Sequence, residues 1–176
     1  RIYYQSKALR DKVEIHEGSI SLIAGSIAAL TAVVFGLEYI VYPGLFSFAY
    51  VLRYPDWLRW LGVTALGGGI LLLWLSHHHL GRSFHSLVVS KEDRVLVKTG
   101  PYRWIRHPIY TAYLLNYVGG GLLSSNLVLT FVPVTMYAIL VGIRMQKEEE
   151  MLHGEFGREY SEYMERTGRL LPRIIS

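Results

Sequence analysis

Long apolar segments alternate with short polar ones along this chain of 176 residues. The first two are Ser19 to Tyr42, whose single charge is Glu38, and Trp57 to Leu80. A helix of either length measures about 36 Å, enough to cross the ~30 Å hydrocarbon layer of a bilayer. Helices of soluble proteins rarely stay apolar for so long. The pattern therefore predicts two membrane-spanning helices.

Glycines interrupt the second apolar segment at Gly62 and at residues 67–69. They would weaken a helix in water, but in lipid they allow a neighbouring helix to approach closely. The first segment carries small residues between Ala24 and Ala29. We expect these two surfaces of small residues to pack against each other.

A pair of shorter apolar segments follows at residues 108–123 and 127–143, joined by Ser124-Ser125-Asn126. The first measures about 24 Å as a helix, which is short for a full crossing. Ser and Asn are good N-caps for the helix that follows them. The pattern predicts a tight helical hairpin.

A charged, amphiphilic stretch from Arg144 to Tyr163 predicts a helix that continues out of the membrane, with Gly154 and Gly157 as possible break points. The fold class is thus an all-α integral membrane protein. We expect one domain over residues 1–176, in which the loop at 81–107 and the C-terminal region from 144 to 176 lie outside the membrane.

The basic residues gather between the apolar segments. Of 18 Lys and Arg, four precede the first segment, two lie between the first and second, six lie within 82–106, and six follow from 144 onward. If the spans alternate, 16 of the 18 lie on one side. The positive-inside rule then makes that side cytoplasmic. The net charge of +4 would suit nucleic acid, but the distribution of the basic residues between apolar segments indicates a bilayer partner instead.

Other features of composition limit the chemistry. Cysteine is absent, which excludes disulfides and Cys-ligated metals. The three consecutive histidines at 77–79 cannot converge on one ion while a helix persists, so we expect no metal site. There is no phosphate-binding loop and no dinucleotide fingerprint after a strand. Because the chain begins with Arg1 rather than Met, we expect an N-terminal segment to be missing.

The stretch from Thr99 to Tyr110 is crowded with rigid and polar groups where an apolar helix begins. Pro108 suits the first turn of that helix and holds His107 in an extended conformation. Tyr102, His107 and Tyr110 would then lie at a helix N-terminus, which favours anions. A membrane-interface anchor built from Tyr, Trp and Arg is the alternative interpretation.

Arg144 and Glu148 are one helical turn apart, so their side chains share a face at the membrane boundary. A surface ion pair is the plain explanation. Ionisable residues at the edge of a membrane bundle that point inward are more often functional. The two residues are therefore candidates for a site.

Two linked motifs resemble the isoprenylcysteine carboxyl methyltransferase family. They are RVLVKTGPYRWIRHPIY at 94–110 and, after the hairpin, RMQKEEEMLHGEFGREYSEYMERTGRLLP at 144–172. Order and spacing match the family, within the wider phospholipid and isoprenylcysteine methyltransferase superfamily, and the C-terminal motif is especially similar to prokaryotic members. The first 75 residues match only as generic membrane helices.

The resemblance implies an integral membrane enzyme, in a prokaryotic plasma membrane, that uses S-adenosylmethionine and releases S-adenosylhomocysteine. It implies no Rossmann domain, five spans in the intact chain, and a cytosolic cofactor pocket roofed by the C-terminal helix and loops. By position, the cofactor contacts would be Arg94, Val95, Leu96, Val97, Tyr102, His107, Pro108, Ile109, Tyr110 and Glu148. Many members have His at the position of Arg94, so this contact departs from the family pattern.

The catalytic residues that the resemblance implies are Glu148, which would balance the cofactor's charge, and Arg144, which would bind the substrate. An arginine orients an anionic acceptor, which favours carboxyl O-methylation of a prenylcysteine-like or other lipophilic acceptor. Phospholipid N-methylation and thiol S-methylation are the alternatives, and a non-enzymatic membrane scaffold is a third. Trp104 and Arg106 are expected to remain interface anchors.

Overall fold

The computed structural model describes residues 19–50, 53–80 and 95–173. Within these ranges, every secondary-structure element longer than a single bridge is a helix. In chain order these are α2 (Ser19–Val41), the 3-10 helix η1 (Ser47–Tyr50), α3 (Asp56–Leu80), the 3-10 helix η4 (Gly100–Arg103), α4 (Pro108–Ser124), α5 (Leu127–Phe156) and α6 (Arg158–Arg166). Extended pairing in this part of the chain is limited to one bridge between Ile105 and Gly168. The predicted all-α architecture is confirmed.

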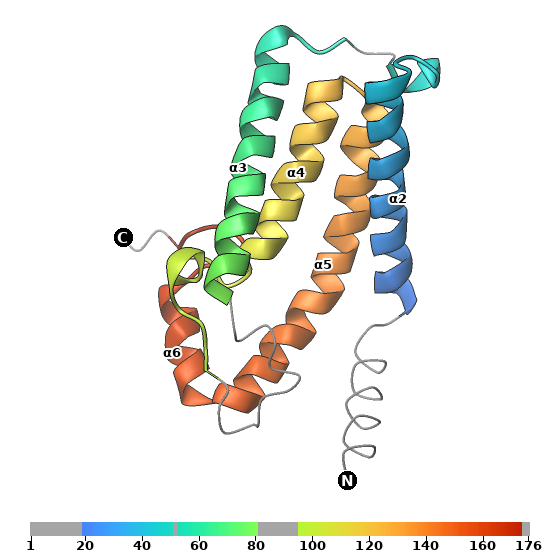
Figure 1. Ribbon diagram of the computed structural model, residues 1–176. Coiled ribbons are helices and arrows are strands. Elements are labelled where there is room, and N and C mark those ends of the chain that lie inside the picture. The colour runs from blue at the N-terminus through green and yellow to red at the C-terminus, as the bar shows by residue number, and fades with distance from the viewer. Residues whose placement is uncertain (1–18, 51–52, 81–94, 174–176) are drawn as a thin grey trace.

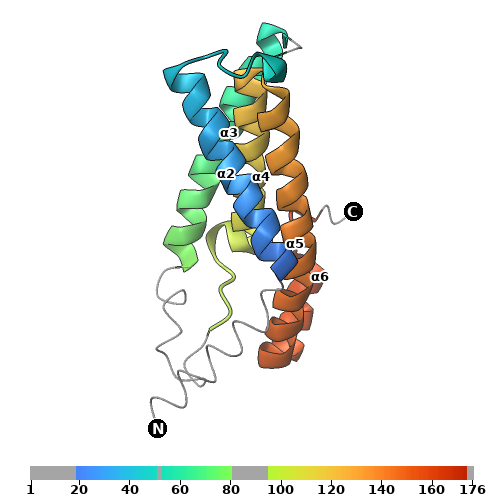
Figure 2. The ribbon, with the colours of Figure 1, turned by 90° about the vertical axis from the view of Figure 1, so that its right-hand side faces the viewer.

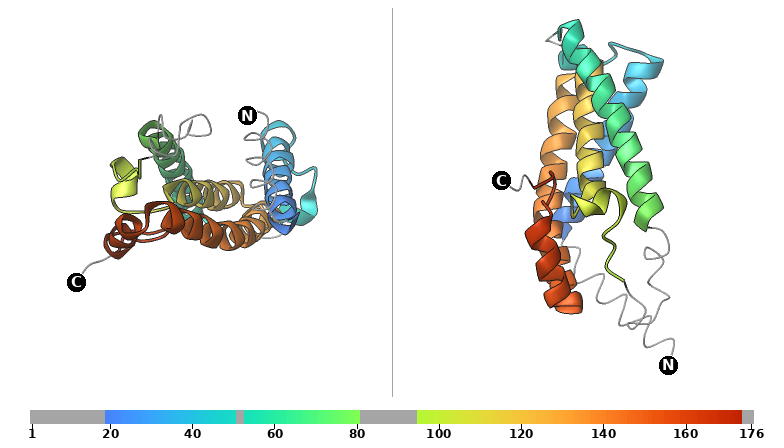
Figure 3. Two further views of the ribbon diagram at one scale, coloured as in Figure 1. Left: turned by 90° about the horizontal axis from the view of Figure 1, so that it is seen from below. Right: turned by 90° about the vertical axis from the view of Figure 1, so that its left-hand side faces the viewer.

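The four long helices form an antiparallel bundle in which each helix runs opposite to the one before it (Figure 1, Figure 2). By length and composition, α2, α3 and α5 can each cross a membrane. The fourth helix, α4, has 17 residues and packs against both α3 and α5. Because the helices alternate, the end of α3, the start of α4, the end of α5 and α6 all lie at one end of the bundle (Figure 3).

Small residues bring α3 close to α4. Gly62, Gly69 and Ser76 are buried and spaced one heptad apart along α3. A Cβ at Gly62 would lie 2.8 Å from the carbonyl oxygen of Gly119, so no larger residue fits there. At Gly67 and Gly68 a Cβ would meet open space. The heptad positions, and not the whole glycine run, therefore make the contact.

The expected pairing of α3 with the small residues of α2 was wrong. Ala28 is fully buried and packs with Tyr137 and Val141 of α5. A Cβ at Gly25 would meet the side chain of Leu140, also on α5. α2 and α3 follow each other in the chain but do not pack side by side. The α4–α5 hairpin lies between them (Figure 3).

The predicted hairpin between α4 and α5 is confirmed, with the polar joint as its turn. Ser125 ends α4 in the left-handed conformation, with φ of 55°. The side chain of Asn126 accepts a hydrogen bond of 2.9 Å from the N–H of Leu129 and so caps α5. A Cβ at Gly121 would meet the backbone of Thr130, which shows how closely the two helices cross.

The last helix of the bundle extends beyond it as one piece. α5 has 30 residues and carries Arg144, Glu148 and Gly154 without interruption. It ends at Gly157, whose φ of 50° is unfavourable for other residues. Of the two expected break points, only Gly157 is used. There α6 begins and turns the chain back, and the tail (residues 167–173) then returns toward the start of α4 (Figure 1).

Candidate functional site

The connector (residues 95–107) holds His107 at the N-terminus of α4. Gly100 opens η4 with φ of 57°, and the ring of His79 occupies the space that a Cβ would need there. Pro108, which is fully buried, begins α4, where a missing N–H costs nothing. His107 precedes it with φ −122° and ψ 59°, outside the helical region. Its side chain is thus fixed at the end of the bundle from which α5 emerges.

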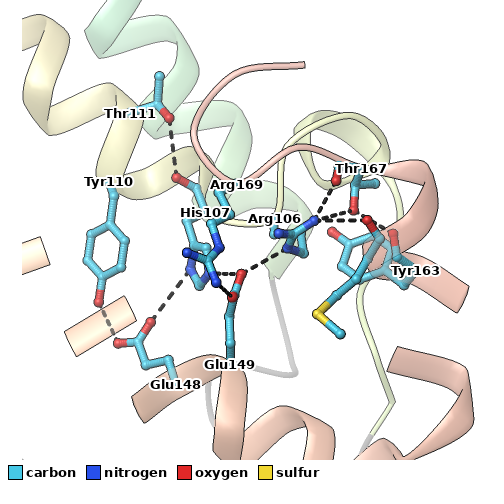
Figure 4. Close-up of polar contacts among 10 residues, drawn as sticks. Arg106, His107, Tyr110, Thr111, Glu148, Glu149, Tyr163, Thr167 and Arg169 are labelled. Carbon is cyan, nitrogen blue, oxygen red and sulfur yellow. Dashed lines mark hydrogen bonds and ion pairs between the residues drawn. The ribbon is translucent and has the colours of Figure 1, made fainter. Parts of the chain in front are cut away.

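Four candidate residues form one set of contacts, here called the Glu148 cluster: His107, Tyr110, Arg144 and Glu148. Figure 4 labels the first two and Glu148. The Tyr110 hydroxyl donates a hydrogen bond of 2.5 Å to Oε1 of Glu148. The rings of His107 and Tyr110 stack with centroids 5.5 Å apart. Nδ1 of His107 lies 3.7 Å from Oε2 of Glu148, and Nε of Arg144 lies 3.8 Å from Oε1.

Glu149 belongs to a separate set of contacts, the Glu149 network. Its Oε1 accepts a hydrogen bond of 2.9 Å from Nε of Arg106 and lies 3.4 Å from Nε2 of His107. Its Oε2 lies 2.7 Å from Nη2 of Arg169. The side chains of Glu149 and Arg106 are only 8% and 9% exposed. An isolated charge at this depth would be costly, and the arginines offset that cost.

Arg106 is therefore not the membrane-interface anchor that its position in the sequence suggested. Besides Glu149, its guanidinium donates hydrogen bonds to the carbonyl oxygens of Met164, at 3.2 Å, and Thr167, where α6 ends. Trp104 is 54% exposed, in keeping with an anchor. Arg106 is drawn inward because three segments of the chain supply it with acceptors.

The tail pairs with the connector through backbone hydrogen bonds. The N–H groups of Arg106 and His107 donate to the carbonyl oxygens of Gly168, at 2.8 Å, and Arg169, at 3.0 Å. The N–H of Gly168 donates to Trp104 at 3.1 Å. The candidate site is thus assembled from the connector, the emerging end of α5 and the tail.

Burial dominates the electrostatics of His107. It lowers the pKa of the imidazole, although the carboxylates of Glu148 and Glu149 act to raise it. His107 is consequently neutral near pH 7. Of its two carboxylate contacts, the one from Nε2 to Glu149 is shorter, at 3.4 Å against 3.7 Å from Nδ1 to Glu148, which favours Nε2 as the protonated nitrogen.

Tyr160, on α6, is fully buried beside the Glu149 network. Burial raises the pKa of its phenol to about 12, so the group stays protonated. Its hydroxyl oxygen has no hydrogen-bond partner within the part of the chain that the structure describes. Buried hydroxyls are normally paired, so the Tyr160 hydroxyl is an exception to the usual pattern.

The other expected cofactor residues lie in different surroundings. Val95 is exposed and Leu96 and Val97 are half-buried, in an extended segment that an ion pair of 2.7 Å between Lys98 and Glu159 joins to α6. Ile109 is half-buried in the first turn of α4. Arg94 lies outside the described residues.

Tyr102 is bound to α6 rather than to the Glu148 cluster. Its carbonyl oxygen accepts a hydrogen bond of 2.6 Å from the Tyr163 hydroxyl. The ring is buried, and burial raises the pKa of its phenol to about 12. Tyr102 therefore helps to fix the connector against the C-terminal helix.

Tyrosines continue from the Glu148 cluster into the bundle. Tyr110, Tyr113 and Tyr117 follow one face of α4, and their rings surround Tyr137 of α5 at centroid distances of 6.4, 6.0 and 5.2 Å. Tyr137 itself is buried in the hydrophobic core. An apolar, aromatic surface thus adjoins the polar cluster.

The histidines at the end of α3 have unrelated contacts. Nδ1 of His77 lies 2.9 Å from the carbonyl oxygen of Leu73, and His78 stacks on Trp74 at 5.6 Å. Among the described residues, no group of three His, Asp or Glu side chains is placed to hold a metal ion.

Sequence reasoning missed the Glu149 network and Tyr160. Glu149 lies in a run of three glutamates, and such runs usually face solvent. Arg169 lies in a tail without periodic pattern. The one available signal was that Arg106 directly precedes His107, so that a rigid connector must place both near the same partners.

The donor set of the site fits a cationic small molecule. Glu148 supplies a carboxylate with 32% exposure, and the stacked rings of His107 and Tyr110 supply aromatic faces. Carboxylates and aromatic faces both attract cations such as a sulfonium.

One family model and several known proteins are similar to this chain. The model of the isoprenylcysteine carboxyl methyltransferase (ICMT) family matches residues 60–154. The protein-S-isoprenylcysteine O-methyltransferase of Saccharomyces cerevisiae is 30% identical over 98% of this chain and 71% of its own length. The cobalt-zinc-cadmium resistance protein CzcN of Cupriavidus metallidurans is 32% identical over 66% of this chain and 55% of its own length.

The fold also has a counterpart among solved structures. The structure of a eukaryotic intramembrane Ras methyltransferase, ICMT, aligns with a TM-score of 0.63 and 28% sequence identity. The alignment covers 85% of this chain and 52% of that protein. The chain thus spans about half the length of two of the proteins that it matches.

Proposed function

This chain belongs to the isoprenylcysteine carboxyl methyltransferase family, and on that premise we propose that it transfers a methyl group from S-adenosylmethionine to the carboxylate of a lipophilic acceptor. The observation that carries the proposal is the Glu148 cluster, in which a carboxylate, an arginine and stacked aromatic rings meet at the end of a membrane bundle. The protein is an integral membrane protein, as its helices and its structural counterpart indicate.

S-adenosylmethionine supplies a methyl group that is already activated on a sulfonium. Glu148 balances the positive charge of that group, and the hydrogen bond from Tyr110 fixes the carboxylate in position. His107 is neutral and so does not neutralise Glu148. Val95 to Val97 and Tyr102 are proposed as further contacts on family grounds.

Arg144 orients the acceptor. A guanidinium binds a carboxylate through two parallel hydrogen bonds, whereas an ammonium acceptor would be repelled by it. A carboxylate is already an anion near pH 7, so transfer needs alignment and exclusion of water more than a strong base. This favours carboxyl O-methylation over methylation of a phospholipid amine.

The lipophilic part of the acceptor is expected to lie along the membrane-facing helices. The tyrosine face of α4 adjoins the Glu148 cluster and offers an aromatic surface to an apolar chain. A prenylcysteine-like acceptor combines a carboxylate with such a chain. The name of the yeast relative points to the same class of acceptor.

We propose that the site faces the cytoplasm. The residues that build it share the side of the chain to which 16 of the 18 Lys and Arg are assigned by alternation. A prokaryotic plasma membrane remains a prediction from the resemblance of the C-terminal motif.

A transfer assay tests the proposed function. Purified protein in lipid nanodiscs is incubated with S-adenosylmethionine labelled in its methyl group and, separately, with a prenylcysteine, a small thiol or phosphatidylethanolamine. We expect base-labile label, the signature of a methyl ester, on the prenylcysteine alone. Label on phosphatidylethanolamine or on the thiol instead would contradict the assignment of the acceptor.

A further inference from the structure

Arg169 reaches the candidate site from the tail. Its Nη2 lies 2.7 Å from Oε2 of Glu149, while Arg106 and His107 share the other oxygen of the same carboxylate (Figure 4). The side chain of Glu149 is 8% exposed, and that of Arg169 is 52% exposed. One half-exposed cation thus compensates one buried anion from the solvent side.

Glu149 and Glu148 hold opposite nitrogens of the same imidazole. Nε2 of His107 is 3.4 Å from Glu149, and Nδ1 is 3.7 Å from Glu148. An imidazolium here would donate to both carboxylates at once, and it would then cancel the charge of Glu148. Whether His107 takes up that second proton depends on how much negative charge Glu149 presents to it.

Resting on the function proposed above, we propose that Arg169 is a positioning residue: by neutralising Glu149 it keeps His107 from taking up a second proton, and so preserves the negative charge of Glu148 for a sulfonium cofactor. Arg106 supports the same effect from the connector. The C-terminal tail is then a working part of the cofactor site.

Among the groups around His107, the arginines are the ones that can offset the negative charge of Glu149. Glu148 and Glu149 from α5 are anionic, and Tyr110 from α4, stacked on the imidazole, is a neutral phenol that binds Glu148. Arg106 and Arg169 are the cations of the network. Removing one of them leaves Glu149 less compensated and favours the imidazolium.

An Arg169→Met variant tests this role without dismantling the tail. The tail is held by backbone groups: the carbonyl oxygen of Arg169 accepts from the N–H of His107 at 3.0 Å, and that of Leu170 accepts from the Thr111 hydroxyl at 2.7 Å. Both bonds survive the substitution. Because half of the Arg169 side chain is exposed, Met leaves no buried cavity.

Arg173 provides the matched control. It is a tail arginine that is exposed and donates to the backbone carbonyl oxygen of Glu165 at 2.7 Å. Arg173→Met removes the same charge from the same segment without touching the Glu149 network. Arg169→Lys keeps the charge at the site and serves as the conservative rescue.

The first measurement is the titration of His107 in the cofactor-free protein. Histidines carrying ¹³C are followed by NMR, and the signal of His107 is assigned by its loss in His107→Gln. We expect His107 of Arg169→Met to titrate at a higher pH than in the wild type, and His107 of Arg169→Lys and Arg173→Met to titrate as in the wild type. Identical titration in Arg169→Met and the wild type would overturn the proposal.

The second measurement is the affinity for S-adenosylmethionine by calorimetry at pH 6 and pH 8. We expect Arg169→Met to weaken binding about fivefold at pH 6, the effect of one half-exposed ion pair, and to bind as the wild type does at pH 8. A loss of equal size at both pH values would show a merely structural role and would also overturn the proposal. If the wild type fails to bind at either pH, the proposed function fails, whereas the titration of His107 still decides the role of Arg169.

Discussion

Glu148 and Glu149 are neighbours in the chain, yet their carboxylates have separate partners. Glu148 accepts a hydrogen bond of 2.5 Å from Tyr110 and has 32% exposure. Glu149 is 8% exposed and bound by Arg106 and Arg169 at 2.9 and 2.7 Å. Successive residues on a helix point about 100° apart, which makes this division possible. The charge of Glu149 is therefore neutralised by arginines of the protein itself, and Glu148 is the more exposed carboxylate of the two, which a ligand can reach.

Replacing Glu148 by Gln should weaken the binding of S-adenosylmethionine at least about tenfold, because charged hydrogen bonds in partly buried sites contribute ~1.5–3 kcal/mol. Glu150→Gln, at an exposed position of the same helix, is the control and should bind as the wild type does. Calorimetry on both variants is the measurement. Equal affinities in the two variants would remove Glu148 from the site.

Replacing Arg144 by Ala should lower the rate of methyl transfer by about 10- to 100-fold, because a charged hydrogen bond to the acceptor is lost. Affinity for S-adenosylmethionine should change little, since Arg144 is assigned to the acceptor. Lys147→Ala, which removes another cation from α5, should leave both quantities unchanged. The role assigned to Arg144 is wrong if its variant binds the cofactor poorly but turns over normally once saturated.

Replacing Gly69 by Val should destabilise the bundle by about 1–3 kcal/mol, the usual cost of overpacking. A Cβ at Gly69 would lie 2.9 Å from the carbonyl oxygen of Ala112, so α3 and α4 would have to separate. At Gly68 the same substitution meets open space and should be tolerated. Thermal unfolding in detergent distinguishes the two variants. Similar unfolding temperatures would contradict the assignment of Gly69 to the helix contact.

Stability should fall as the pH drops below the ordinary histidine pKa of 6.5. Burial lowers the pKa of His107 in the folded protein, so between the two pKa values the unfolded chain binds more protons than the folded one. The contribution of neutral His107 to the free energy of unfolding is thus present above pH 6.5 and is lost as the pH falls toward the pKa of the folded protein.

Unfolding temperatures of the wild type and of His107→Gln, measured from pH 7.5 to 5.5, test this linkage. The wild type should lose stability more steeply than the variant over that range, because the other titrating groups are common to both. Parallel profiles would mean that His107 is not buried as a neutral group.

The helices could be predicted from the sequence, but not all of their neighbours. Long apolar segments predict spans, and the Ser and Asn of the joint predict the hairpin, because both signals are local. The small residues of α2 and α3 show that close packing is possible, but not with which helix. Gly62 and Gly69 meet α4, and Ala28 meets α5, because the intervening connection and the hairpin decide the arrangement.

Some residues of the candidate site could be predicted from the sequence, and others could not. His107, Tyr110, Arg144 and Glu148 come from two motifs whose spacing matches the family, and the structure brings them together. Arg106 looked like an anchor and Arg169 was overlooked, because their partner Glu149 is far from both in sequence. Ionic contacts between distant segments have no periodic pattern by which a single sequence reveals them.

Hydrogen–deuterium exchange of the purified protein with and without S-adenosylhomocysteine tests the central claim most directly, since it reports both binding and its place. We expect slower exchange in the connector at 95–107, in the first turn of α4, in α5 around 144–150 and in the tail at 167–170. The far end of the bundle, around η1 (Ser47–Tyr50), should exchange as it does without ligand. No protection at millimolar ligand, or protection confined to the η1 end, would contradict a cofactor site at the Glu148 cluster.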